Sequence, residues 1–165
     1  MGVVGNSAMI EVVGGNAALQ KRIREAVARF PAWFVRAARV TRFEVSDSPE
    51  VRDQIAVYQH GSRVIYVWSK VGGLLQRAVG HEMGHAIDDN FDQPHAFSSQ
   101  ADWIQIHKNQ SNFDLPKYAE IPLEYFADMV TKYFMYGPQK LSTTNPQEVV
   151  FISNVFSILQ EEFGK

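Results

Sequence analysis

The chain of 165 residues contains no cysteine, so a disulfide framework, a thiolate zinc site and a cysteine nucleophile are all excluded. It also lacks an apolar run of the roughly 18 residues that a membrane span requires. No excess of positive charge is present, because 16 Lys and Arg residues face 18 Asp and Glu residues, for a net charge of -2. We therefore expect neither a membrane nor a nucleic acid as partner.

The N-terminal residues 1–6 have no positively charged stretch of the kind that opens a signal peptide. Asn6 also stands where the myristoylation pattern needs Ser or Thr. Two expectations stay open: a secreted protein in its mature form, without its signal peptide, or a cytoplasmic protein. Length and ordinary globular composition predict one domain over residues 1–165, acting as a monomer.

The hydrophobic pattern predicts an α+β fold, with a small mixed β-sheet that includes a β-hairpin, followed by a mostly helical half. Strands are expected at 8–13, 40–45, 55–58 and 64–68, the last two joined by the hairpin loop 60–62. Helices are expected at 17–30, with a break at Pro31 and a further turn at 33–35, then at 74–89, from Ser98 or Ser99 to about 109, at 122–136 and at 146–163. Asn16 and Asn145 are the expected N-caps of the first and last helices.

The segment His81-Glu82-Met83-Gly84-His85 carries the clearest chemical signal. Two histidines four residues apart project from one face of a helix and can hold one ion, for which neutral imidazole and Zn²⁺ are well matched. Glu82 follows the first ligand directly and points toward the place where a water would bind. A carboxylate there can take a proton from that water and pass it to the leaving amine.

The motif arises by chance in a chain of this length at a rate of roughly a few per thousand. The surrounding residues 74–87 are strongly apolar, which predicts a buried helix rather than a surface helix that happens to carry histidines. Gly80 and Gly84 lower helix propensity, and they either allow a backbone or substrate to approach closely or simply ease packing.

A third metal ligand has to come from elsewhere, and a downstream carboxylate is expected. Glu124, in the helix 122–136, is the preferred candidate, and Glu120 is the competing one. Asp128 lies one turn beyond Glu124 and is expected to accept the distal N–H of a ligating histidine, most simply that of His81.

The runs 81–88 and 124–128 together resemble the catalytic-domain family of anthrax lethal factor, in which the small secreted Pro-Pro endopeptidases are similar in size. The resemblance implies a zincin-like metallopeptidase domain with one Zn²⁺, held by His81, His85 and Glu124, and Glu82 as catalytic acid and base. That is a gluzincin-type endopeptidase, acting on a peptide or protein and implying a preference for proline-containing substrates. It also implies an oxyanion-stabilising tyrosine, for which Tyr118 is the nearest match and Tyr125 the fallback.

Relatives of this architecture bind substrate as an added strand along a sheet edge. We expect residues 63–70 to be that edge, with Tyr66 and Trp68 on one face as candidate substrate contacts. The loop 60–62 is much shorter than the corresponding excursion in the Pro-Pro endopeptidases, which weakens transfer of their specificity. His60, His95 and His107 lack ligand spacing and are expected to be surface or hydrogen-bonded histidines.

Two other functions remain open. A non-catalytic zinc-binding module of the same fold, or a decayed enzyme, is favoured by Leu123 in place of a second glutamate and by the position of Tyr118, one residue nearer Glu124 than the family pattern has it. Hydrolysis of a non-peptide amide would use the same chemistry.

Overall fold

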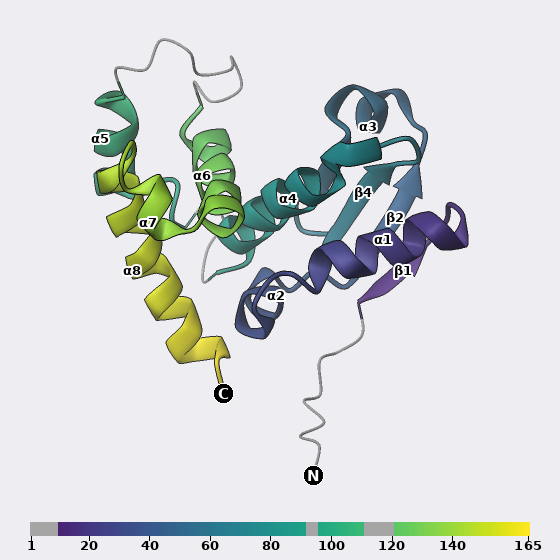
Figure 1. Cartoon of the computed structure of the whole chain (residues 1–165), viewed down its shortest axis with the longest axis horizontal. Coiled ribbons are helices and arrows are strands. Elements are labelled where there is room, and N and C mark those ends of the chain that lie inside the picture. Colours follow the sequence, from purple (N-terminus) through teal and green to yellow (C-terminus); the bar gives the residue numbers. More distant parts are fainter. Residues whose placement is uncertain (1–9, 92–95, 111–120) are drawn as a thin grey trace.

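Four short strands form one mixed β-sheet in the first half of the chain (Figure 1), in a computed structural model that describes residues 10–91, 96–110 and 121–165. The strands are β1 (Glu11–Val13), β2 (Arg42–Ser46), β3 (Ala56–Gln59) and β4 (Val64–Trp68). Their order is β1-β2-β4-β3, with β1, β2 and β4 parallel and β3 antiparallel to β4. The predicted hairpin is confirmed. The predicted edge is wrong, because β4 pairs on both sides and β3 is the edge strand beside it.

One face of the sheet is covered by helices. Val12, Phe43, Ile65 and Tyr58 are register partners across the four strands, share this face and are all buried. The helices on this side are α1 (Ala17–Val27) and α4 (Leu75–Asn90) (Figure 1). The alternation that predicted the strands therefore reflects a sheet with one core face.

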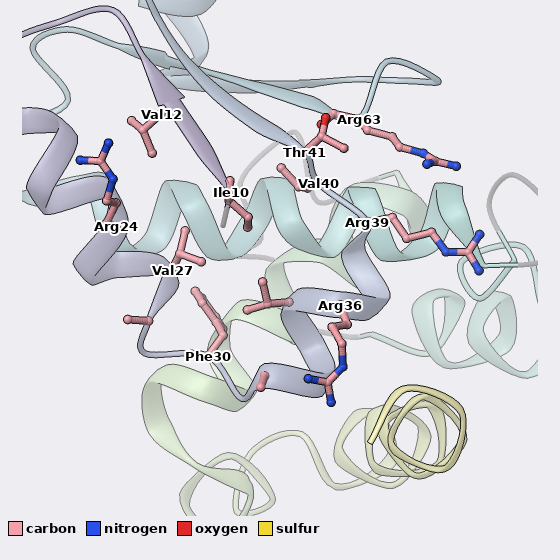
Figure 2. A pocket seen from close by; sticks show the side chains of 13 residues that line it. Ile10, Val12, Arg24, Val27, Phe30, Arg36, Arg39, Val40, Thr41 and Arg63 are labelled. Carbon is pink, nitrogen blue, oxygen red and sulfur yellow. The ribbon is translucent and has the colours of Figure 1, made fainter. Parts of the chain in front are cut away.

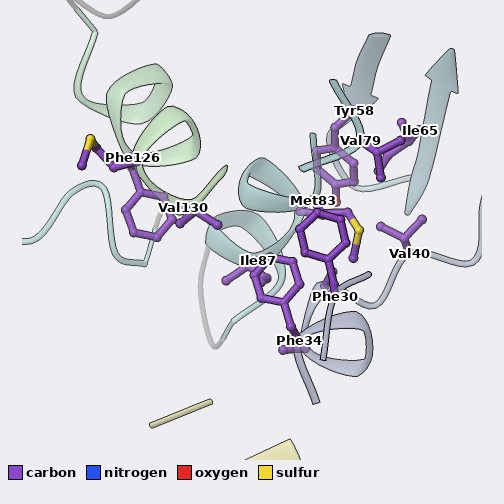
Figure 3. Close-up of a cluster of buried hydrophobic side chains, with 14 of the residues drawn as sticks. Phe30, Phe34, Val40, Tyr58, Ile65, Val79, Met83, Ile87, Phe126 and Val130 are labelled. Carbon is purple, nitrogen blue, oxygen red and sulfur yellow. The ribbon is translucent and has the colours of Figure 1, made fainter. Parts of the chain in front are cut away.

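The motif helix α4 runs through the centre of the molecule. Its side chains Val79, Met83 and Ile87 are fully buried, between the sheet on one side and Phe126 of α6 on the other (Figure 3). It begins and ends one residue later than predicted, after a short 3₁₀ turn at Gly72–Leu74. Its burial confirms the expectation drawn from the apolar segment 74–87.

The second half is helical, as predicted. It contains α5 (Ala101–Lys108), α6 (Pro122–Tyr136), α7 (Pro138–Leu141) and α8 (Pro146–Phe163). Helix α8 packs against α2 (Ala32–Ala38), and Phe34, Phe134 and Phe156 from three helices form one aromatic cluster there. No helix of the described residues is both long enough and apolar enough to cross a membrane.

Some helix starts follow the predicted caps and others do not. Asn16 caps α1, since its Oδ1 accepts the Leu19 N–H at 2.9 Å, and Pro31 separates α1 from α2. Asn145 precedes α8 but makes no side-chain capping bond. The predicted start of α5 at Ser98 or Ser99 is wrong: the Ser98 hydroxyl donates to Asp88 at 2.6 Å, and the helix begins at Ala101.

Helices α3 (Pro49–Gln54) and α7 were not predicted. Ser48 followed by proline is the start signal of α3, in which the Ser48 Oγ accepts the Val51 N–H at 3.5 Å. Residues 8 and 9 of the first expected strand lie outside the described residues.

Candidate metal centre

His81 and His85 face the same side of α4, and their donor atoms lie close together. The Nε2 atoms are 3.1 Å apart, and the two rings stand nearly perpendicular. The side chains are 18% and 9% exposed, so both imidazoles are mostly withdrawn from water. The spacing of four residues on a regular helix therefore gives the convergence that the sequence predicts.

Glu124, in the first turn of α6, completes the group. Its Oε2 lies 2.9 Å from the His81 Nε2 and 3.3 Å from the His85 Nε2. A tetrahedral zinc with bonds of about 2.0–2.1 Å would hold neighbouring ligand atoms roughly 3.3 Å apart. The donor set and its spacing thus fit zinc with shifts of a few tenths of an ångström. The competing candidate, Glu120, lies outside the described residues.

His81 and Glu124 each stabilise the charged form of the other. Burial by itself opposes ionisation of Glu124, but hydrogen bonds from His81 and His85 outweigh it and lower the pKa of Glu124 well below its usual range. Burial likewise opposes protonation of His81, yet the hydrogen bond to Glu124 and the nearby charge of Glu82 raise the pKa of His81. An ionised carboxylate therefore sits against two imidazoles, a ligand chemistry suited to a divalent cation.

Glu82 is buried beside the two histidines and is held by the sheet. Its Oε2 accepts the backbone N–H of Tyr58 in β3 at 2.7 Å. Burial raises the pKa of Glu82, although the charges of His85 and His81 and the Tyr58 N–H act in the opposite direction. A carboxyl group with a raised pKa, fixed next to the ligand cluster, is suited to proton transfer.

The bond to Tyr58 arises from the free edge of β3. The Trp68 N–H donates to the Ile55 carbonyl at 2.9 Å. Because backbone hydrogen bonds alternate along an antiparallel pair, Val57 and Gln59 direct their N–H and C=O groups toward β4. The backbone groups of Ala56 and Tyr58 therefore face the free edge. The sequence did not reveal this contact, because it depends on which hairpin strand is the edge.

Two hollows flank the ligand cluster, and both are lined by Gln54, His81, Glu82 and Glu124. The larger, about 650 Å³, extends along β3 toward His60. The smaller, about 400 Å³, extends toward residues 53–56 and the start of α4 at Leu74, Arg77 and Ala78. Among the described residues, the ligand cluster therefore lies in a groove that these two hollows form together.

A polar network lies beside the larger hollow. Asp89 accepts hydrogen bonds from the Tyr58 hydroxyl at 3.0 Å and the Gly61 N–H at 3.2 Å, and its Oδ1 lies 3.1 Å from the His60 Nδ1. Burial opposes ionisation of Asp89, but the contacts with His60 and Gly61 outweigh it and lower its pKa. His60 is thus a hydrogen-bonded histidine, as expected, and it also lines the hollow.

Gly80 and Gly84 let α6 approach α4 closely. A Cβ atom on Gly84 would lie 3.0 Å from the Ala127 Cα, and one on Gly80 would lie 3.1 Å from the Thr131 Cγ2. Of the interpretations left open by the sequence, close approach of another backbone applies to Gly84, whereas Gly80 makes room for side chains. Because Glu124 is on α6, these contacts also set its distance from the histidines.

Asp128 and Asp88 anchor the surroundings of the cluster. The oxygens of Asp128 contact Arg77 at 3.2 Å and Lys132 at 2.7 Å, and within the described residues no hydrogen bond joins Asp128 to His81. Asp88 is fully buried and accepts the N–H groups of Phe97 and Ser98 at 2.8 Å, which fixes the chain after α4. Asp128 thus forms ion pairs with Arg77 and Lys132 in place of the hydrogen bond expected with His81.

The aromatic residues predicted to contact substrate or to stabilise the oxyanion differ in their positions relative to the groove. Tyr66 lines the larger hollow, whereas Trp68, on the same face of β4, lines neither of the two hollows as the described residues bound them. Tyr125 belongs to the core: it is 1% exposed and its hydroxyl donates to Glu148 at 2.8 Å. That location removes it as an oxyanion residue. Tyr118 lies outside the described residues.

Neither a scan against protein-family models nor a search of curated proteins finds a match to this chain. Inference about its chemistry therefore rests on the residues and geometry of the site itself.

Proposed function

We propose that this protein is a zinc-dependent endopeptidase with a zincin-like fold, related to the lethal factor catalytic-domain family. The observation that carries the proposal is the convergence of His81, His85 and Glu124 donor atoms beside the buried carboxylate of Glu82. Among the described residues, these three form the one group of His, Asp and Glu side chains close enough to hold an ion. Three protein ligands leave a fourth position for water or substrate, as in catalytic zinc sites.

Zinc bound here would act as a Lewis acid toward the scissile carbonyl and would lower the pKa of water to near 7. Glu82 removes a proton from the attacking water as its oxygen bonds to the carbonyl carbon. The same proton is then delivered to the amide nitrogen as the C–N bond breaks, which returns Glu82 to its carboxylate form. The Tyr58 N–H keeps the Glu82 carboxylate oriented through this cycle, because it is part of the strand backbone.

The substrate is proposed to lie as an added strand along β3. Ala56 turns its N–H and C=O, and Tyr58 its C=O, toward the free edge, so an extended peptide can form ladder hydrogen bonds there. Within the part of the chain that the structure describes, the groove extends to both sides of the ligand cluster, which favours cleavage within a chain over removal of a terminal residue. Tyr66 would contact substrate residues from the wall of the larger hollow.

Two finer features stay predictions. Tyr118 is the proposed oxyanion donor on the strength of the family resemblance alone. A preference for proline-containing substrates has the same basis, and the hairpin loop between Gln59 and Val64 is short. A non-catalytic zinc module would instead require a closed set of four protein ligands.

The decisive experiment is a peptide-library cleavage screen with the wild-type protein and Glu82→Gln. We expect Glu82→Gln to lose roughly 10²- to 10⁴-fold in cleavage rate, the usual contribution of a positioned general base, while keeping its zinc content. Glu50→Gln, at an exposed carboxylate that lines the same hollow, is the matched control for zinc content. Glu161→Gln, at an exposed carboxylate of α8 that lines neither hollow, is the control for activity. Full activity in Glu82→Gln would overturn the assignment.

A further inference from the structure

A second cavity shares no lining residue with the two hollows of the groove. It measures about 810 Å³ and lies where α1, α2 and the beginnings of β1 and β2 meet (Figure 2). Its floor is apolar and is formed by Val12, Val27, Phe30, Val35 and Val40. Cavities of this size and polarity are typical of small-molecule sites.

Four arginines surround this apolar floor: Arg24, Arg36, Arg39 and Arg63. Among the described residues, no aspartate, glutamate or lysine lines the cavity, although acidic residues outnumber basic ones in the whole chain. Guanidinium groups bind carboxylates through paired N–H donors, and like charges gathered over low-dielectric walls concentrate a positive potential. The arginines therefore give the border of the cavity a positive charge.

Two of the four arginines are ordered by the end of α8. Arg36 donates through Nε to the Phe163 carbonyl at 2.8 Å, and the guanidinium of Arg39 lies 5.6 Å from the centroid of the Phe163 ring. Arg24 and Arg63 make no ion pair or side-chain hydrogen bond with any described residue. These two charges are thus available to a ligand at no loss of internal contacts.

We propose that this cavity binds a single-chain amphiphile with a carboxylate head group, such as a free fatty acid. The aliphatic chain covers the floor of valines and Phe30, and the carboxylate is held at the rim by Arg24 or Arg63. An apolar body and one anionic end match the two surfaces of the cavity, whereas a neutral or cationic amphiphile would leave the arginines uncompensated.

The test is isothermal titration of the wild-type protein with decanoate and with decyltrimethylammonium, both below their micelle concentrations. We expect saturable binding of one decanoate per chain, at least roughly tenfold tighter than the cation, because a charge-assisted hydrogen bond is worth about that factor. The double variant Arg24→Gln/Arg63→Gln should weaken decanoate binding by tenfold or more. Arg52→Gln/Lys70→Gln removes the same charge from exposed positions away from the cavity and should change binding less than twofold.

A second variant keeps the test independent of those arginines. Val27→Glu places a carboxylate on the floor and should also weaken decanoate binding by tenfold or more, with the fold verified by circular dichroism. Equal binding of the two amphiphiles, unchanged affinity in Arg24→Gln/Arg63→Gln, or binding only to anionic vesicles or acidic peptides would overturn the proposal. None of these outcomes depends on zinc or on peptide cleavage.

Discussion

The groove around the metal ligands and the arginine-rimmed second cavity use charge in opposite ways. In the groove, His81, His85 and Glu124 contact one another and Glu82 contacts the sheet edge, and these close neighbours shift the pKa values of His81, Glu82 and Glu124. Around the second cavity, four arginines extend from an apolar floor with their side chains exposed. The proposed binding of a metal in the groove therefore depends on the position of each ligand group. The proposed binding of an anion in the second cavity depends on the total positive charge around it.

The largest difference between the groove and the second cavity is expected when Glu124, the proposed third metal ligand, is replaced. Glu124→Gln retains the shape of the side chain but loses the charge held between the two imidazoles. We expect zinc affinity to fall by more than the roughly 10- to 100-fold that loss of an outer partner costs, with decanoate affinity unchanged. Competition with a fluorescent zinc chelator measures the first quantity, and titration calorimetry measures the second.

Equal loss of both affinities in Glu124→Gln would mean that the variant is misfolded or that the two cavities are not independent. Unchanged zinc affinity would point to Glu120 as the ligand. Glu50→Gln again supplies the control for removing a carboxylate from the groove.

A smaller effect on zinc affinity is expected from a substitution that disturbs the packing of α4 on α6. Gly84→Ala would push its new methyl group to 3.0 Å from the Ala127 Cα, which forces the helices apart and should cost roughly 1–3 kcal/mol, partly offset by about 1 kcal/mol of helix propensity. Zinc affinity should fall with it, because Glu124 moves away from the histidines. Chemical denaturation and chelator competition measure the two effects.

Gly73→Ala is the control for this substitution, since no atom lies within 4 Å of the position of its Cβ. Zinc affinity in Gly84→Ala equal to that of the wild type would show that the spacing of the helices does not position Glu124.

The smallest effect concerns Asp89, at the border of the groove. Its pKa is lowered in the folded protein, so its contribution to stability is complete above its ordinary pKa of about 4 and is lost as pH falls through the lower folded value. We expect the melting-temperature difference between wild type and Asp89→Asn to be constant above about pH 5 and to shrink below pH 4. Asp53→Asn, at an exposed position of α3, should show no such trend.

A melting-temperature difference for Asp89→Asn that grows as the pH falls would contradict the direction of this shift. Thermal unfolding of both proteins, followed by circular dichroism at pH 3 to 7, shows whether the difference shrinks or grows as the pH falls.

The parts of the molecule that sequence alone anticipated are those governed by local periodicity. The hairpin strand Val64–Trp68, helix α6 and the buried character of α4 follow from spacing within one segment. The convergence of Glu124 with the histidines was anticipated because a catalytic zinc site needs a third ligand. Local pattern was therefore sufficient for these elements, whereas the short helices α3 and α7 were not predicted and the position of Glu124 followed from the chemistry of the site.

The features that sequence did not reveal depend on pairing between distant segments. Strand order decides that β3, and not β4, is the free edge, and no local pattern in 63–70 carries that information. Ser98 is a good cap by type, but Asp88 competes for its hydroxyl. The arginines of the second cavity are scattered along the chain from Arg24 to Arg63 and only the fold assembles them.

X-ray absorption at the zinc edge, on protein loaded with one equivalent of zinc, tests the central claim most directly. We predict four light-atom ligands, of which two are imidazoles, one is a carboxylate and one is exchangeable solvent, and we predict loss of one imidazole in His85→Ala. A closed site with four protein ligands and no exchangeable solvent, or a spectrum unchanged in His85→Ala, would contradict it.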